Sequence, residues 1–192
     1  MSSVIAPPAP RLRPERWERR AQKRWLKRRD AVSGRLAELC AIEGLLDQAA
    51  DVVSAGWVQG AWFTVATAEG SRAVTGHDVG LASDRPVTGA CLVGAVVQAA
   101  GGPATVRSQL VQRTLDLVRH ALKEEADRPV RWCPGPRLRM LGVLELTHWN
   151  DAPGRTKSEV VDLLAVARQT AEMERHRCRA EQAGLDARHQ LV

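Results

Sequence analysis

Apolar residues recur at helical spacing in three segments of this 192-residue chain. No other feature of the sequence restricts the possible folds as strongly as this periodicity. Each segment carries one apolar stripe that has to be buried against another element, which predicts a helical core. The stripes consist of Leu36, Leu39, Cys40, Leu46, Ala49, Ala50 and Val53, then of Leu110, Val111, Leu115, Val118, Ala121 and Leu122, and finally of Val160, Leu163, Leu164, Ala167 and Ala171. We expect the first helix to end at Gly56, with an interruption upstream at Ser33-Gly34.

Other segments predict a minor β component. Residues 61–66 are rich in Trp, Phe, Thr and Val and predict a short strand, and the extended apolar run "MLGVLELTHW" predicts another. Residues 68–89 contain several glycines and polar residues and are interpreted as a loop, whereas "GACLVGAVVQAAGG" predicts a short buried helix. The expected fold class is α+β: a predominantly helical single domain with a small two- or three-stranded sheet, plus an N-terminal basic helical arm.

The positive charge of the chain is concentrated at its N-terminus. Residues 1–30 contain ten Lys and Arg against three Asp and Glu, a net +7, whereas the remainder contains 18 basic and 19 acidic residues. We therefore expect a disordered leader over residues 1–14, a basic helical arm over 15–32, a compact domain over 33–175 and a charged helical tail over 176–192.

A basic helix that also carries tryptophans is typical of a nucleic-acid-binding arm. We predict a non-enzymatic binding or regulatory protein whose residues 11–29 contact DNA or RNA. The alternative is a phage or cellular assembly protein, whose arm and tail bind protein partners or other copies of the chain. The predicted contact residues are Arg16, Trp17, Arg20, Lys23, Arg24, Trp25, Lys27 and Arg28. The competing interpretation is a solvated helix whose tryptophans pack on the body, since Arg is abundant throughout this chain. The apolar runs are too short to predict a membrane span.

Cysteine and histidine placement raises an enzymatic alternative. Cys91 stands near the start of a predicted helix, and His148 with Asn150 and Asp151 follows later, in the order found in papain-like cysteine hydrolases. In the other interpretation, Cys91 is a small buried apolar residue and His148 a half-exposed strand residue. We favour this second interpretation, in which the protein is not an enzyme and none of these residues is catalytic.

Other kinds of site have weak support. The four cysteines stand far apart, without a C-x-x-C pair, which disfavours a disulfide framework and favours reduced thiols in the cytoplasm. The spacing of histidines and cysteines predicts no metal site, and the phosphate-loop and dinucleotide-binding glycine motifs do not occur, so we expect no cofactor.

The segment "HWNDAPGRTKSEV" predicts a joint between a strand and a helix. Residues 152–155 suit a type II turn, with Pro153 and Gly154 at its centre. Thr156 and Glu159 form a capping-box pair for the last helix. We expect an Asx turn at Asn150 or Asp151 and a core position for Trp149.

Three short motifs give the body a recognisable pattern: Gly-Trp-x-x-Gly, Cys-x-x-Gly-Ala and Trp-Asn-Asp. Over about residues 45–168 the chain resembles a family of small uncharacterised proteins from actinobacteria and their phages. The matching positions are Gly56, Trp57, Gln59, Gly60, Cys91, Gly94, Ala95, Trp149, Asn150 and Asp151. The resemblance implies an actinobacterial or phage origin, a cytoplasmic setting and one compact domain, and it implies no activity.

Overall fold

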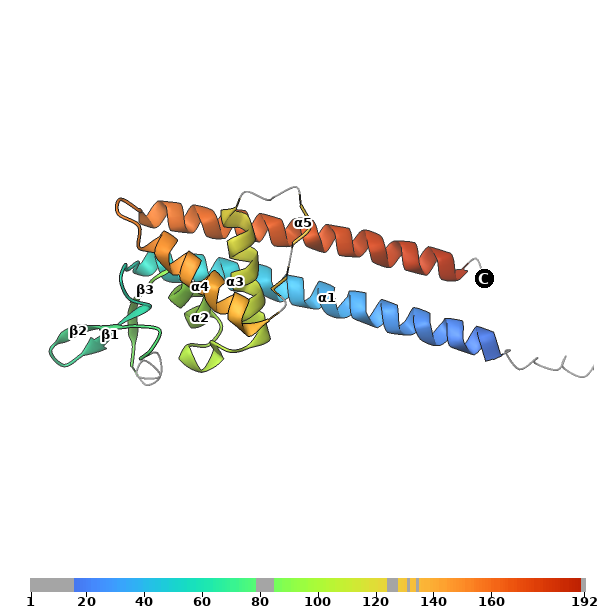
Figure 1. The fold of residues 1–192 in the computed structure, drawn as a ribbon, viewed down its shortest axis with the longest axis horizontal. Coiled ribbons are helices and arrows are strands. Elements are labelled where there is room, and N and C mark those ends of the chain that lie inside the picture. Colours follow the sequence, from blue (N-terminus) through green and yellow to red (C-terminus); the bar gives the residue numbers. More distant parts are fainter. Residues whose placement is uncertain (1–15, 79–84, 124–127, 131, 134, 191–192) are drawn as a thin grey trace, which may run out of the picture.

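The computed structural model describes residues 16–78, 85–123, 128–130, 132–133 and 135–190. The predicted fold class is confirmed, because helices predominate and one small antiparallel sheet lies at one end of the molecule (Figure 1). In chain order the elements are α1 (Arg16–Ala55), β1 (Phe63–Thr67), β2 (Gly70–Val74), β3 (Val87–Ala90), α2 (Leu92–Ala99), the 3-10 turn η2 (Pro103–Thr105), α3 (Gln109–Leu122), α4 (Pro136–Asn150) and α5 (Lys157–Gln190). The leader predicted over residues 1–14 lies outside the described residues.

Helices α1 and α5 form a long antiparallel pair that extends well beyond the rest of the molecule (Figure 1). Ion pairs connect the two helices along their length, from Arg168 with Asp47 at 2.8 Å, through Arg175 with Glu43 at 2.7 Å, to Arg28 with Glu181 at 3.1 Å. Buried apolar residues continue between the helices as far as Leu185. We call the outer part of this pair, residues 16–35 and 178–190, the distal stalk.

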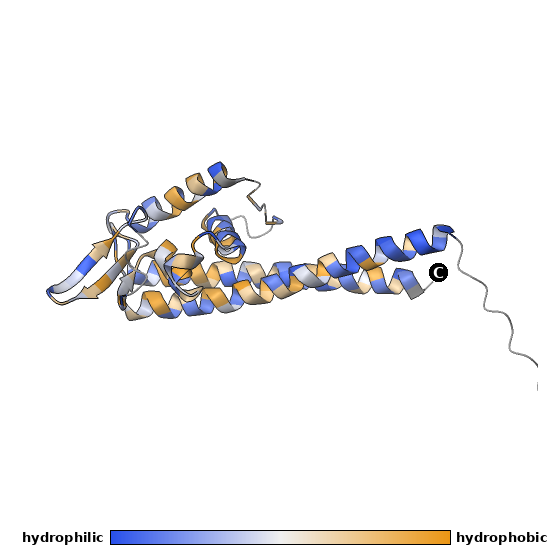
Figure 2. Ribbon diagram, turned by 90° about the horizontal axis from the view of Figure 1, so that it is seen from below, coloured by the Kyte–Doolittle hydropathy of each residue, from blue (hydrophilic) through white to orange (hydrophobic). Residues whose placement is uncertain are grey.

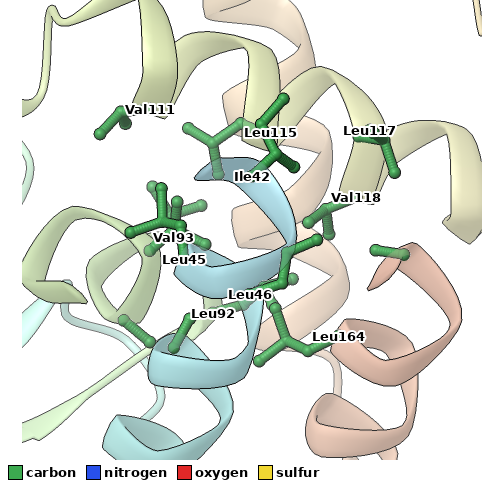
Figure 3. Close-up of a cluster of buried hydrophobic side chains, with 14 of the residues drawn as sticks. Ile42, Leu45, Leu46, Leu92, Val93, Val111, Leu115, Leu117, Val118 and Leu164 are labelled. Atoms are coloured by element: carbon green, nitrogen blue, oxygen red, sulfur yellow. The ribbon is translucent and has the colours of Figure 1, made fainter. Parts of the chain in front are cut away.

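The remaining elements form a head on one end of the helix pair. The sheet has the order β2-β1-β3, and both neighbours pair antiparallel with β1. Leu92 and Val93 of α2 and Leu115 and Val118 of α3 gather around the α1 residues of the core (Figure 3). The inner half of α1 is therefore the central helix of the core, and the outer half of the same helix forms part of the distal stalk.

The prediction of a strand over residues 140–149 is wrong, because these residues form most of α4. The helix begins at Pro136, a residue favoured in a first helical turn, and it buries Gly142, Leu146 and Asn150 at intervals of four. Met140 and Leu144 are exposed, at 62% and 46%. The run looked continuously apolar, and therefore strand-like, because apolar residues occupy the exposed face of this helix as well as its buried face.

Two further predictions are also corrected. Residues 68–89 hold strands β2 and β3 and are not merely a loop. Helix α1 continues through Ser33-Gly34 without a break, because Val32 and Leu39 are buried on either side and tie the helix to its neighbours. The domain boundaries expected after residue 32 and before residue 176 consequently fall inside continuous helices. The predicted strand near 61–66 and the helices of α2 and α3 are confirmed.

Candidate functional site

Basic side chains cover the outer face of α1 in the distal stalk. Arg16, Arg20, Lys23 and Lys27 follow one another at intervals of four, three and four residues, so they lie on one face of the helix. All four are exposed, as are the flanking Arg19 and Arg24. We call these six residues the basic face. Figure 2 shows the corresponding end of α1 as strongly hydrophilic.

The charges of the basic face are not offset by carboxylates within the described part of the chain. None of its six residues has an ion pair there, whereas Arg28 pairs with Glu181 at 3.1 Å and Arg29 with Asp30 at 3.5 Å. Several like charges held on one helix face create a positive potential that attracts anions.

The opposite face of the same helix turn packs on α5. The indole Nε1 of Trp25 donates to the backbone oxygen of Leu185 at 3.3 Å, and its ring stacks on His189 with 4.0 Å between centroids. Trp25 therefore holds the two helices together, and its ring is already stacked within the chain. Trp17, two helical turns earlier, is 57% exposed.

The three sequence motifs of the body meet at Asn150, which is fully buried at the end of α4. Its Oδ1 accepts from the indole of Trp57 at 2.9 Å and from the backbone N–H of Leu92 at 3.0 Å. Its Nδ2 donates to the oxygens of Val58, at 3.1 Å, and Asp151, at 2.8 Å. One amide thus joins three segments that are far apart in the sequence.

Neighbouring side chains complete this network. Asp151 accepts from the backbone N–H of Gly60 at 3.0 Å. The amide of Gln59 donates to the backbone oxygens of Asn150, at 2.9 Å, and Ala152, at 3.2 Å. The prediction of an Asx turn is wrong, because the side chains of Asn150 and Asp151 bond to the segment that contains Val58 and Gly60. We call Trp57, Gln59, Gly60, Asn150 and Asp151 the motif cluster, and its hydrogen bonds explain why these residue types occur together.

Cys91 caps α2 from a fully buried position. Its Sγ accepts from the N–H of Gly94 at 3.4 Å, and burial raises the pKa of the thiol to about 11. A side chain at Gly94 would meet the backbone oxygen of Trp62 at 2.0 Å, so glycine is required for this close approach. A thiol with a raised pKa is a poor nucleophile at neutral pH.

His148 lies on the exposed side of α4 and not on a strand. In the described part of the chain it has no hydrogen bond with Cys91. Because the thiol is buried and protonated, the arrangement gives no support to a Cys91–His148 catalytic pair.

The turn and the cap predicted after Asp151 are confirmed. The N–H of Arg155 donates to Ala152 at 3.1 Å across the turn, and Gly154 has the positive φ of 82° that a type II turn requires. Thr156 and Glu159 bond reciprocally through their backbone N–H groups, at 2.8 and 3.3 Å. Trp149 is half-buried at the edge of the core, with the Arg155 guanidinium 3.9 Å above its ring.

The described residues contain no group of three His, Cys, Asp or Glu side chains that could hold a metal ion. Within the same residues, every helix falls short of the length or the apolar character needed to cross a bilayer.

A model of a family of unknown function (DUF6197) matches residues 40–170. This range includes the motif cluster and stops short of the distal stalk on both helices. Neither a curated protein nor a solved structure matches the chain.

Proposed function

The chain belongs to the family of unknown function DUF6197, and we propose that it is a non-enzymatic protein that binds nucleic acid through the basic face of the distal stalk. The observation that carries this proposal is the exposure of six basic residues on the side of α1 that does not face α5. The distal stalk lies outside the matched range, so the proposal concerns a part of this chain that the family model does not cover. It assumes a cytoplasmic setting, in an actinobacterial or phage-infected cell.

Phosphate contacts explain the geometry better than base contacts. Arg and Lys on one helix face can follow a backbone of regularly spaced phosphates, and this binding does not depend on sequence. Trp25 is stacked on His189, so base stacking by this ring is not part of the proposal. We therefore expect low sequence preference and strong dependence on salt.

The surroundings of Cys91 do not favour the enzymatic alternative. Cys91 is 0% exposed and serves as the cap of α2, and Asn150 and Asp151 are occupied in the motif cluster. A cysteine hydrolase needs a thiolate that a substrate can reach.

The test compares two triple variants of the full chain. Arg20→Gln, Lys23→Gln and Lys27→Gln remove charge from the basic face while keeping residues that favour a helix. The matched control, Arg72→Gln, Arg85→Gln and Arg137→Gln, removes the same charge from exposed positions on the head. Fluorescence anisotropy with a mixed-sequence DNA duplex and a single-stranded RNA gives the affinities, at salt concentrations from about 50 to 200 mM.

We expect the basic-face variant to lose at least about tenfold in affinity at the lower salt concentration, with a shallower salt slope. The control should bind within about twofold of the unmodified protein, because its substitutions lie outside the contact. Equal weakening of both variants would show that only the overall charge matters. Either that result or the lack of salt-dependent binding by the unmodified chain contradicts the proposal.

A further inference from the structure

A cavity of about 810 Å³ lies in the head between α4, the start of α3 and the segments that flank the β1–β2 hairpin. Its apolar wall includes Trp62, Met140, Val143 and Leu144. Volumes of roughly 300–1,000 Å³ with mostly apolar walls are typical of sites for small organic molecules. Neither the motif cluster nor the basic face of the stalk takes part in this cavity.

One end of the cavity is basic. Arg107 and Arg139 line it, and the same two residues line an adjoining pocket of about 380 Å³ together with Arg113 and Trp132. A mostly apolar cavity and a more polar pocket therefore share Arg107 and Arg139 in their walls. This arrangement suits a molecule that has an anionic head and an apolar body.

The charges at this end are only partly balanced. Arg113 is paired with Glu38 at 2.8 Å and lies over Trp132 at 4.0 Å. Arg139 donates to the backbone oxygen of Cys133 at 3.4 Å, but its buried Nε has no hydrogen-bond acceptor in the described part of the chain. Asp116 interacts electrostatically with Arg139 and offsets part of its charge.

Arg107 differs from these two arginines. It is exposed, and it forms no ion pair with any residue that the structure describes. A buried donor without an acceptor at Arg139 and an unbalanced charge at Arg107 both favour an anionic ligand at this end.

We propose that the head binds an amphipathic carboxylate of the fatty-acid class. The carboxylate accepts hydrogen bonds from Arg107 and Arg139, and the hydrocarbon chain lies against Trp62, Met140 and Leu144. This occupant also accounts for the exposure of Met140 and Leu144, which would otherwise leave apolar surface in water. The site shares no residue with the proposed nucleic-acid interface, so either can hold without the other.

Isothermal titration calorimetry of the full chain with dodecanoate, below its micelle concentration, tests the proposal. Dodecanol has the same tail without the charge, and dodecyltrimethylammonium has the opposite charge. We expect dodecanoate to bind roughly tenfold or more tightly than dodecanol, because charged hydrogen bonds to arginine add to burial of the tail. The cationic analogue should bind most weakly.

Substitutions in the cavity wall test which residues contact the carboxylate and which contact the hydrocarbon chain. Arg107→Gln should reduce the affinity for dodecanoate by at least about threefold and leave dodecanol binding unchanged, because it removes one of the two guanidinium groups that hold the carboxylate. Met140→Ser with Leu144→Ser should weaken both ligands, since the tail loses its wall. Leu138→Ser is the control, because Leu138 is equally exposed on α4, at 53%, but lines a different pocket. Exposed positions are chosen so that folding is retained, and thermal melting checks this.

Three results would overturn the proposal: no binding of dodecanoate, equal binding of dodecanoate and dodecanol, or equal effects of the Leu138 and Met140/Leu144 variants. A fourth is concentration-dependent dimerisation in analytical ultracentrifugation that the Met140/Leu144 variant abolishes. That outcome would assign the exposed apolar face of α4 to a second copy of the chain.

Discussion

At the scale of single residues, Asn150 has the most demanding position in the molecule. A buried amide can donate twice and accept through its oxygen, and here Trp57, Leu92 and Val58 use these groups together with Asp151. Trp57 and Val58 belong to the segment after α1 and Leu92 to the start of α2, so the amide joins both segments to the end of α4. Since an unsatisfied buried polar group costs free energy, removal of the amide affects all of them at once.

We predict that Asn150→Ala lowers the free energy of unfolding by about 3 kcal/mol, because several buried groups lose their partner together. Asn150→Asp should also destabilise, since a carboxylate cannot donate to Val58 and places a second charge beside Asp151. Urea denaturation followed by circular dichroism measures both changes. Gln169→Ala, at an exposed position on α5, is the control and should change stability by less than about 0.5 kcal/mol. A loss at Asn150 no larger than that of the control would contradict the structural role.

At the scale of elements, two helical glycines have opposite roles. Gly94 lies where α2 approaches the backbone before β1, and a side chain there would overlap the oxygen of Trp62. Gly34 lies within α1, and an added side chain would have no atom within 4 Å. The first glycine permits a tight contact, whereas the second only gives the unfolded chain extra freedom.

We therefore expect Gly94→Ala and Gly34→Ala to change stability in opposite directions. Gly94→Ala should cost at least about 2 kcal/mol, because the backbone of α2 has to move away from the sheet. Gly34→Ala should add about 0.5–1 kcal/mol, since alanine favours a continuous helix. Thermal and urea unfolding of each variant measure the effect. Destabilisation by Gly34→Ala would mean that α1 is interrupted at this position.

The sequence predicted most of the helical elements, because their burial is one-sided and leaves a periodic pattern. It failed for α4, whose exposed Met140 and Leu144 remove the contrast between the two faces. The capping pair of Thr156 and Glu159 was predictable because both partners lie within one turn. The partners of Trp25 were not, since Leu185 and His189 are about 160 residues away and nothing in the local sequence indicates them.

At the scale of the whole molecule, the four cysteines lie in regions that differ in burial, so their reactivities indicate the local stability of each region. All four are free: Cys40 is exposed on α1, Cys91 and Cys133 are buried in the head, and Cys178 is buried in the distal stalk. Among the residues that the structure describes, two helices bury the side chains of the distal stalk, whereas several elements surround Cys91. Local opening of the stalk should therefore require less free energy than opening of the head.

We predict that thiol alkylation at about pH 8 proceeds in the order Cys40, Cys178 and then Cys91. Cys40 should react at once because it is exposed. Cys178 should react when the stalk opens locally, and Cys91 only when the whole molecule unfolds. Burial also keeps the Cys91 thiol protonated at this pH, because its pKa is raised to about 11. Pulsed alkylation with peptide mass spectrometry measures the order, and fast reaction of Cys91 in the folded protein would contradict it.

The sequence alone determined the mainly helical character of this protein, the position of its positive charge and the local joint at residues 152–159. These features arise from interactions within one turn or one helix face, which leave a pattern in neighbouring residues. The tertiary structure decided that the basic segment continues into the core helix and packs on α5. It also decided that the three motifs meet at Asn150 and that two arginines lie at the end of an apolar cavity. These arrangements join residues from distant segments, and such contacts leave no local periodicity from which they could be predicted.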